Sequence, residues 1–250
     1  MTQNIILVHG AFHTGACWYL LKPLLERDGF TVHTPTLPGQ KGNPCHPLLV
    51  SLKSYADHII NTAAAMDGPS ILLGHSLAGF SISAAAERRQ DLFSRLIYLT
   101  AAIPKLGRST LRDAAPSGPS RAPKMKLGLS ATFPQAHADD FMYHLCPPDV
   151  QARARQLLSP QPLRPMLGSV KSTPENLGAI EKHFVECLHD RVMPIDQQRI
   201  KQSHLDFASV QTLDTDHSPF FSAPQALADA IKRAADLGSP ALPTQTRTSP

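Results

Sequence analysis

The segment Ile71–Gly79, with the sequence ILLGHSLAG, constrains the fold of this chain more than any other. An apolar run leads directly into Ser76, and small residues that favour a helix follow it. A strand, a serine and a helix in immediate succession predict a nucleophile elbow, a sharp turn that presents the serine hydroxyl above a sheet edge. Gly74 supplies the usual glycine before the serine, whereas Ala78 stands where a second glycine is common. A methyl group is a small departure, so we expect the elbow to form; the alternative is a serine that merely caps a helix.

Short apolar runs alternate with helical patterns along most of the 250 residues. This alternation is typical of βαβ units, so we predict an α/β fold with a mostly parallel six-stranded sheet flanked by helices. The predicted strands are Asn4–His9, Phe30–Thr34, Ser70–Leu73, Leu96–Thr100, His183–Leu188 and Ala208–Leu213. The predicted helices of this core are Trp18–Arg27, Ser51–Met66, Leu77–Arg89 and Pro224–Ala235.

The stretch 102–180 interrupts this alternation and differs in composition from its flanks. It holds 11 of the 23 prolines, and 10 Lys or Arg against 5 Asp or Glu give it a net charge of +5. An insertion between two core strands is where a lid over an active site would lie. We therefore predict an inserted helical lid, or cap, with helices at Ala138–Leu145 and Pro148–Leu158.

The residues outside this insertion are assigned to a core and a tail. Residues 1–101 and 181–237 form the predicted core, and 238–250, rich in Pro, Ser and Thr, form a predicted disordered tail. Within the cap, we expect 107–128 to be irregular because prolines and glycines are frequent there.

The composition of the chain argues against several classes of function. A formal net charge of +4, dispersed along the chain, gives no reason to expect a nucleic-acid partner. No apolar run approaches the roughly 20 residues that span a bilayer, and the first strand begins too early to leave room for a secretory signal. The four cysteines show no metal-ligand spacing and are expected to be free thiols. We therefore expect a cytoplasmic protein with no membrane partner and no metal.

A serine hydroxyl reacts only when a base takes its proton and an acid orients that base. In this kind of fold, the acid and then the histidine follow the serine along the chain, in loops after later strands. Asp190 follows the fifth predicted strand and His217 follows the sixth, so we predict Ser76, Asp190 and His217 as catalytic residues. Asp214 and Asp216 compete for the acid role, but they share the loop of the histidine.

The oxyanion of the transition state also needs N–H donors. The backbone N–H of Leu77 is one because it follows the nucleophile, and the second should come from the loop after the first strand. We choose Ala11 for that second donor, with Phe12 as the alternative. His9 and His75 lie beside these groups, and we expect both to make structural hydrogen bonds rather than to act on substrate.

We call the segment His9–His13, which carries the second predicted donor, the oxyanion loop. Apolar side chains of the cap and of this loop are candidates for a substrate pocket. We predict substrate contacts from Phe12, Phe141 and Leu145. The wider candidate set, whose members could equally pack the cap on itself, is Phe12, Phe133, Phe141, Met142, Leu145 and Met166.

Over nearly its whole length, the chain resembles the α/β-hydrolase superfamily. Within it, the chain is similar to the group of plant methylesterases, hydroxynitrile lyases and bacterial pyrethroid-hydrolysing carboxylesterases. The resemblance rests on the segments Val8–His13, Cys17–Tyr19, Gly74–Leu77 and Tyr143–Val150, together with Asp190 and His217. It implies that Ser76, Asp190 and His217 act as nucleophile, acid and base, and it adds the expectation of a homodimer.

The predicted function is hydrolysis of a small-molecule carboxylic ester through an acyl-enzyme, without a cofactor. Lactones and thioesters pass through the same kind of intermediate and remain alternatives. The similar hydroxynitrile lyases carry a threonine at the position of Gly10 and a lysine at the position of Ser218, which argues against cyanohydrin cleavage here. A ligand receptor built on the same scaffold is the alternative from a different class.

Overall fold

The computed structural model describes residues 3–110 and 128–236. The tail predicted at 238–250 lies outside these ranges, as do residues 111–127 of the segment expected to be irregular. That expectation is wrong for Gly107–Thr110, which form strand β5 by pairing with the distant strand β8 (Ser169–Ser172). Within the described ranges, no helix combines the length and the apolar character that crossing a membrane requires.

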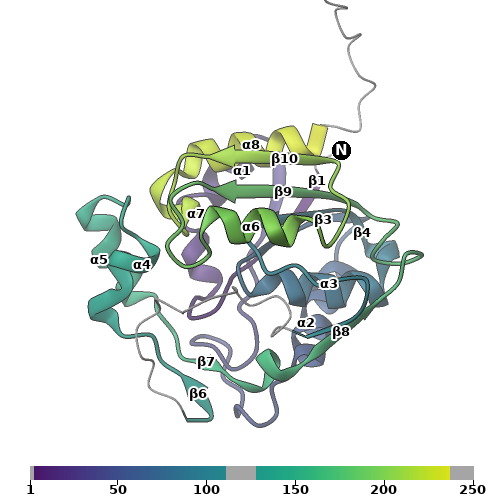
Figure 1. Ribbon diagram of the computed structural model, residues 1–250, viewed down its shortest axis with the longest axis horizontal. Coiled ribbons are helices and arrows are strands. Elements are labelled where there is room, and N and C mark those ends of the chain that lie inside the picture. The colour runs from purple at the N-terminus through teal and green to yellow at the C-terminus, as the bar shows by residue number, and fades with distance from the viewer. Residues whose placement is uncertain (1–2, 111–127, 237–250) are drawn as a thin grey trace, which may run out of the picture.

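Six parallel strands form one sheet in the order β10-β9-β4-β3-β1-β2 (Figure 1). They are β1 (Gln3–Val8), β2 (Phe30–His33), β3 (Ser70–His75), β4 (Phe93–Leu99), β9 (Glu181–Cys187) and β10 (Ser209–Leu213). The predicted sheet is therefore confirmed. Parallel strands are joined by crossovers that cover both faces, which is why the inner strands are apolar. Every residue of β3 is buried.

Alternate side chains of β1 divide the core into two layers. Ile6 and Val8 pack with the helices on one face, and Ile5 and Leu7 pack with those on the other, as the two-residue period of a strand requires. The first face carries α2 (Leu52–Ala64) and α3 (Ala78–Arg88), and the second carries α1 (Lys22–Arg27) and α8 (Pro224–Asp236).

The helix predicted at Trp18–Arg27 is in fact two elements. A 3-10 turn, η1 (Gly15–Trp18), comes first, and α1 begins only at Lys22. Pro23 explains the break, because a proline fits the first turn of a helix but not its interior. Sequence reasoning missed three short helices of the core: η2 (Gln90–Leu92), α6 (Ile195–Gln202) and α7 (Pro219–Ser222).

The insertion lies between β4 and β9, and its helices α4 and α5 lie together at one edge of the molecule (Figure 1). Besides helices, its described residues form two antiparallel strand pairs, β5 with β8 and β6 with β7. The cap elements not yet given are β6 (Ser130–Ala131), η3 (Gln135–His137), α4 (Ala138–Met142), α5 (Pro148–Gln156), β7 (Gln161–Pro162) and η4 (Arg164–Leu167). Sequence reasoning also missed the two 3-10 turns of the insertion, η3 and η4.

The elbow between β3 and α3 has the predicted geometry. Ser76 has a left-handed backbone with φ of 55°, and its N–H donates to the Leu99 carbonyl of β4 at 3.1 Å. Ala78 is buried without disturbing the turn. The close packing falls instead on Gly79, where an added Cβ would lie 2.1 Å from the Ala102 carbonyl oxygen. The glycine that this elbow needs is therefore one residue beyond the usual position.

We predict that Gly79→Ala destabilises the fold by about 2–3 kcal/mol, since the new methyl group must push the Ala102 backbone away. Ala78→Gly is the matched control and should cost only about 1 kcal/mol, the loss of helix propensity. Urea unfolding of the two variants measures both values. Equal stability of the two variants would contradict the assignment of Gly79 as the packed glycine.

Candidate active site

Three side chains from three strand ends meet at one edge of the sheet. Ser76 follows β3, Asp190 lies in the loop after β9, and His217 lies in the loop after β10. The Ser76 hydroxyl lies 3.0 Å from His217 Nε2, and His217 Nδ1 donates to Asp190 Oδ2 at 2.6 Å. His217 and Asp190 are only 3% and 4% exposed, whereas Ser76 is half-buried. The serine is therefore partly accessible to solvent, whereas its two partners are shielded from water.

The Asp190 carboxylate accepts four hydrogen bonds. Oδ1 accepts the backbone N–H groups of Val192 and Met193, each at 2.7 Å. Oδ2 accepts His217 Nδ1–H and also the hydroxyl of Thr100, the latter at 2.5 Å. Sequence reasoning missed Thr100, although it directly follows a strand and so lies at the same sheet edge.

The two competing aspartates have other partners. Asp214 lies on the surface and pairs with His189 at 2.6 Å. Asp216 is fully buried, and its carboxylate accepts the N–H groups of Leu145 and Ser218 at 2.9 and 3.1 Å. Asp216 therefore joins the histidine loop to the cap, and neither aspartate approaches the role predicted for Asp190.

The oxyanion loop after β1 is held by two histidines. His9 Nδ1 donates to the Gly10 carbonyl at 2.9 Å, and its Nε2 accepts the N–H of Leu37 at 3.0 Å. His13 Nδ1 donates in the same way to the Ala11 carbonyl at 2.9 Å. The Gly10 carbonyl and the Ala11 N–H belong to one peptide group, so His9 fixes the direction of the predicted donor. The expected structural role of His9 is thus confirmed.

The two predicted oxyanion donors make no hydrogen bond within the described part of the protein. Across residues 3–110 and 128–236, the backbone N–H groups of Ala11 and Leu77 donate to no protein acceptor. A Cβ added to Gly10 would lie 2.9 Å from the Ser76 Cβ, so the loop backbone passes directly beside the serine. Phe12, the alternative donor, has a left-handed backbone with φ of 64°.

His75 also has the expected structural role. Its Nε2 donates to the backbone carbonyl of His217 at 2.9 Å, and the two rings lie 4.7 Å apart. Burial lowers the pKa of His75 well below the usual value for histidine, so the ring is neutral. His75 therefore supports His217 through the backbone and leaves the His217 ring nitrogens to Ser76 and Asp190.

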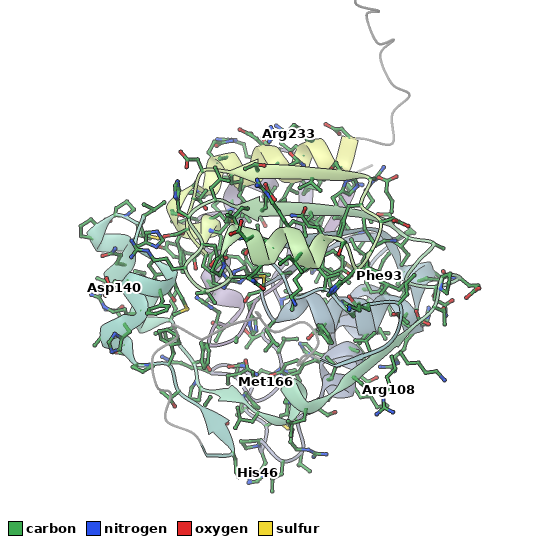
Figure 2. All side chains as sticks on the ribbon, in the orientation of Figure 1. His46, Phe93, Arg108, Asp140, Met166 and Arg233 are labelled. Carbon is green, nitrogen blue, oxygen red and sulfur yellow. The ribbon has the colours of Figure 1, made fainter. Side chains whose placement is uncertain are left out.

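The predicted substrate-binding residues lie in different environments. Phe12 is half-buried and contacts the Phe133 ring edge to face at 5.4 Å between ring centres. Phe141 is half-buried in α4, and the Leu145 side chain is 46% exposed beside the Asp216 contact. Met166, from the wider set, lies in η4, well apart from α4, where Asp140 is labelled (Figure 2). Direct substrate contact by Phe12, Phe141 and Leu145 stays a prediction.

Metal chemistry has no candidate ligand set in the described ranges. No group of three or more His, Cys, Asp or Glu side chains there has an arrangement that could hold a metal ion. The four cysteines, Cys17, Cys45, Cys146 and Cys187, are free thiols.

Because three histidines are buried, we predict that the free energy of unfolding falls in acid. Burial lowers the pKa of His9 to about 4 and that of His13 to about 3, and it lowers the pKa of His75 well below the usual value for histidine. The unfolded chain binds these protons near pH 6.5, so stability is full above that pH and falls as the pH drops toward the folded-state values. At pH 5, each histidine should cost up to about 2 kcal/mol.

Urea unfolding at pH 7.5 and pH 5.0 measures this loss, which we expect to total several kcal/mol. His13→Gln should reduce the difference between the two pH values, whereas His46→Gln, at an exposed histidine, should leave it unchanged. The same free energy of unfolding at both pH values would contradict the assignment of these rings as buried and neutral.

Comparisons with known proteins agree with this geometry. A family model described as the Alpha/beta hydrolase family matches residues 5–230. A pyrethroid hydrolase of Sphingobium wenxiniae is 33% identical over 99% of this chain and 92% of its own length. Methylesterase 3 of Arabidopsis thaliana is 28% identical over 90% of this chain and 93% of its own length. The crystal structure of the pyrethroid hydrolase PytH has a TM-score of 0.81 at 30% identity and covers 94% of this chain and 98% of its own.

The resemblance predicted from sequence motifs is therefore confirmed, and so is the predicted α/β-hydrolase fold. The similarity includes both the core and the inserted cap, because the match covers almost the whole chain. The chain belongs to the α/β hydrolase family.

Proposed function

We propose that this protein hydrolyses small-molecule carboxylic esters through an acyl-enzyme formed on Ser76. The hydrogen-bonded series from Ser76 through His217 to Asp190, at 3.0 and 2.6 Å, is the observation that carries this proposal. The enzyme class predicted from the sequence, a carboxylic ester hydrolase, is confirmed by the named relatives, which include a pyrethroid hydrolase and methylesterases.

The first half of the reaction follows from the hydrogen-bond directions. Because Nδ1 of His217 donates to Asp190, Nε2 is free to take the proton of the Ser76 hydroxyl. The serine oxygen then attacks the ester carbonyl carbon, and the carbonyl oxygen becomes an oxyanion. The backbone N–H groups of Ala11 and Leu77 would hold that oxyanion, each contributing about 3–4 kcal/mol to the lowering of the barrier.

The second half uses the same groups in reverse order. Protonated Nε2 of His217 gives its proton to the leaving alcohol as the tetrahedral intermediate collapses to the acyl-enzyme. Nε2 then takes a proton from a water molecule, whose oxygen attacks the acyl carbon. As this second tetrahedral intermediate collapses, Nε2 returns the proton to the Ser76 oxygen, and the carboxylic acid is released. Every proton transfer passes through one nitrogen, so no cofactor is needed in the proposed cycle.

Particular residues argue against two alternative functions. Cyanohydrin cleavage is disfavoured because Gly10 and Ser218 replace the threonine and lysine of the similar lyases, and a side chain at Gly10 would collide with Ser76. A receptor role is disfavoured because the serine and its base already lie within hydrogen-bonding distance.

The proposal also includes a location and an oligomeric state. We place the protein in the cytoplasm, since its four cysteines are free thiols. The resemblance to the methylesterase group adds a homodimer.

We predict that Ser76→Ala lowers the rate of ester hydrolysis by roughly a millionfold, because the attacking oxygen is lost. Release of a chromogenic alcohol measures the rate, and circular dichroism should show an unchanged fold. Ser218→Ala is the matched control: it removes a buried hydroxyl, one residue from His217, that has no hydrogen-bond partner among the described residues, and it should leave the rate within about twofold. A fluorophosphonate probe should label Ser76 alone, and labelling elsewhere or a fully active Ser76→Ala variant would overturn the proposal.

A panel of esters, lactones and thioesters then separates the hydrolase alternatives. We expect the highest kcat/KM for esters with apolar acyl groups, since Phe12 and Phe133 pair beside the oxyanion loop. Steady-state hydrolysis of matched acyl chains across the three substrate classes makes the comparison direct. Higher kcat/KM for lactones or thioesters would move the assignment to those substrates, and binding without turnover across the panel would favour the receptor.

A further inference from the structure

Three residues other than glycine have a left-handed backbone in the described part of the chain. They are Phe12, Ser76 and Thr100, with φ of 64°, 55° and 37°. Each comes shortly after one of the adjacent inner strands β1, β3 and β4. Such conformations are costly for residues with a Cβ, and they cluster at functional sites because the surrounding structure must hold them. Ser76 is the proposed nucleophile and Phe12 lies in the oxyanion loop, which leaves the strain at Thr100 unexplained.

Thr100 is an unfavourable residue for this conformation, because its side chain branches at Cβ. It is fully buried, and its N–H donates to the Val185 carbonyl of β9 at 2.8 Å. The chain then turns so that the N–H of Ala102 donates to the Ser76 carbonyl at 2.9 Å. The strained residue therefore lies between the backbone that supports the nucleophile and the strand that leads to Asp190.

The Thr100 hydroxyl makes the contact that distinguishes it. It donates to Asp190 Oδ2 at 2.5 Å, and the same oxygen accepts His217 Nδ1–H at 2.6 Å. The other carboxylate oxygen is held by the two backbone N–H groups of its own loop. Thr100 is therefore the donor that fixes Oδ2 independently of the histidine.

We propose that Thr100 is a positioning residue for the hydrolytic reaction, whose hydroxyl holds Asp190 Oδ2 against His217 and takes up part of the charge on that oxygen. The inference rests on the proposed function, which gives Asp190 and His217 their roles. Without the hydroxyl, the bond to His217 Nδ1–H is the one that remains on Oδ2 within the described residues, so the position of the carboxylate against the imidazole is less firmly fixed. The oxygen facing the imidazole also carries more negative charge, so His217 holds its proton to higher pH.

Other titratable groups surround this pair from the oxyanion loop, the elbow, the cap and the neighbouring loops. They are His13, His75, His144, Cys187, Arg191 and Asp216. Burial lowers the pKa of the three histidines and raises that of the Cys187 thiol. All six are unchanged in variants of Thr100, so a difference between those variants reports on the hydroxyl.

Thr100→Val and Thr100→Ser test the proposal as a pair. Valine keeps the branched shape and removes the O–H, whereas serine keeps the O–H and removes the methyl group. We expect Thr100→Val to lower kcat about tenfold at unchanged KM, and to move the acid limb of the kcat/KM profile to higher pH. We expect Thr100→Ser to retain kcat within about threefold, with the acid limb of the wild type. If Thr100→Val does not fold, Thr100→Ala takes its place with the same expected result.

Two outcomes would overturn the role of Thr100. One is a Thr100→Val enzyme with the kcat and pH profile of the wild type. The other is equal impairment of both variants with an unmoved acid limb, which would mean that only the shape of the side chain matters. Titration of the His217 ring protons by NMR in the same variants needs no substrate. The titration therefore tests whether the Thr100 hydroxyl acts on the Asp190–His217 pair, even if Ser76→Ala retains activity and the proposed function itself fails.

Discussion

Six strands that run in one direction limit where this molecule can place reactive side chains. The carboxyl ends of parallel strands meet at a single edge of the sheet, and ligands of open α/β sheets bind beyond that edge. Ser76, Thr100, Asp190 and His217 follow β3, β4, β9 and β10, which are neighbours in the sheet. Residues more than a hundred positions apart along the chain therefore come within hydrogen-bonding distance because their strands share a direction and an order.

Polar groups at a buried edge are costly unless each finds a partner. The carboxylate of Asp190 has four donors, two on each oxygen. His9 and His13 each face a carbonyl with Nδ1, and a carbonyl can only accept, so the proton must lie on that nitrogen. Their Nε2 atoms then accept from Leu37 N–H and Tyr143 O–H. The loop that carries the predicted oxyanion donor is thus fixed before substrate arrives, which is the condition for electrostatic stabilisation of a transition state.

Local patterns in the sequence were sufficient where the physical cause is local. A buried strand appears in the sequence as an apolar run, and the order of the strands led us to two loops, those of Asp190 and His217, that the structure brings together. Features set by distant partners could not be predicted in this way. Strand β5 exists because β8 lies beside it, and the strained Thr100 falls inside a run that predicts only a regular strand. Asp216 competed for the acid role in the sequence because nothing local showed that it has another partner. That partner, the Leu145 N–H, comes from the cap, and no local pattern reveals the position of the cap.

The cap is bound to the core at points next to the reactive groups. Tyr143 donates to His13 at 2.8 Å, the Leu145 N–H donates to Asp216 at 2.9 Å, and the Ser159 N–H donates to the Phe12 carbonyl at 2.8 Å. Two of these three bonds use a backbone N–H of the cap, so a change of side chain at either donor leaves the bond in place. The half-exposed side chain of Leu145 can therefore vary while its backbone still holds the histidine loop. The side chains of the cap can therefore differ while the hydrogen bonds that join its backbone to the loops around Ser76 and His217 are kept.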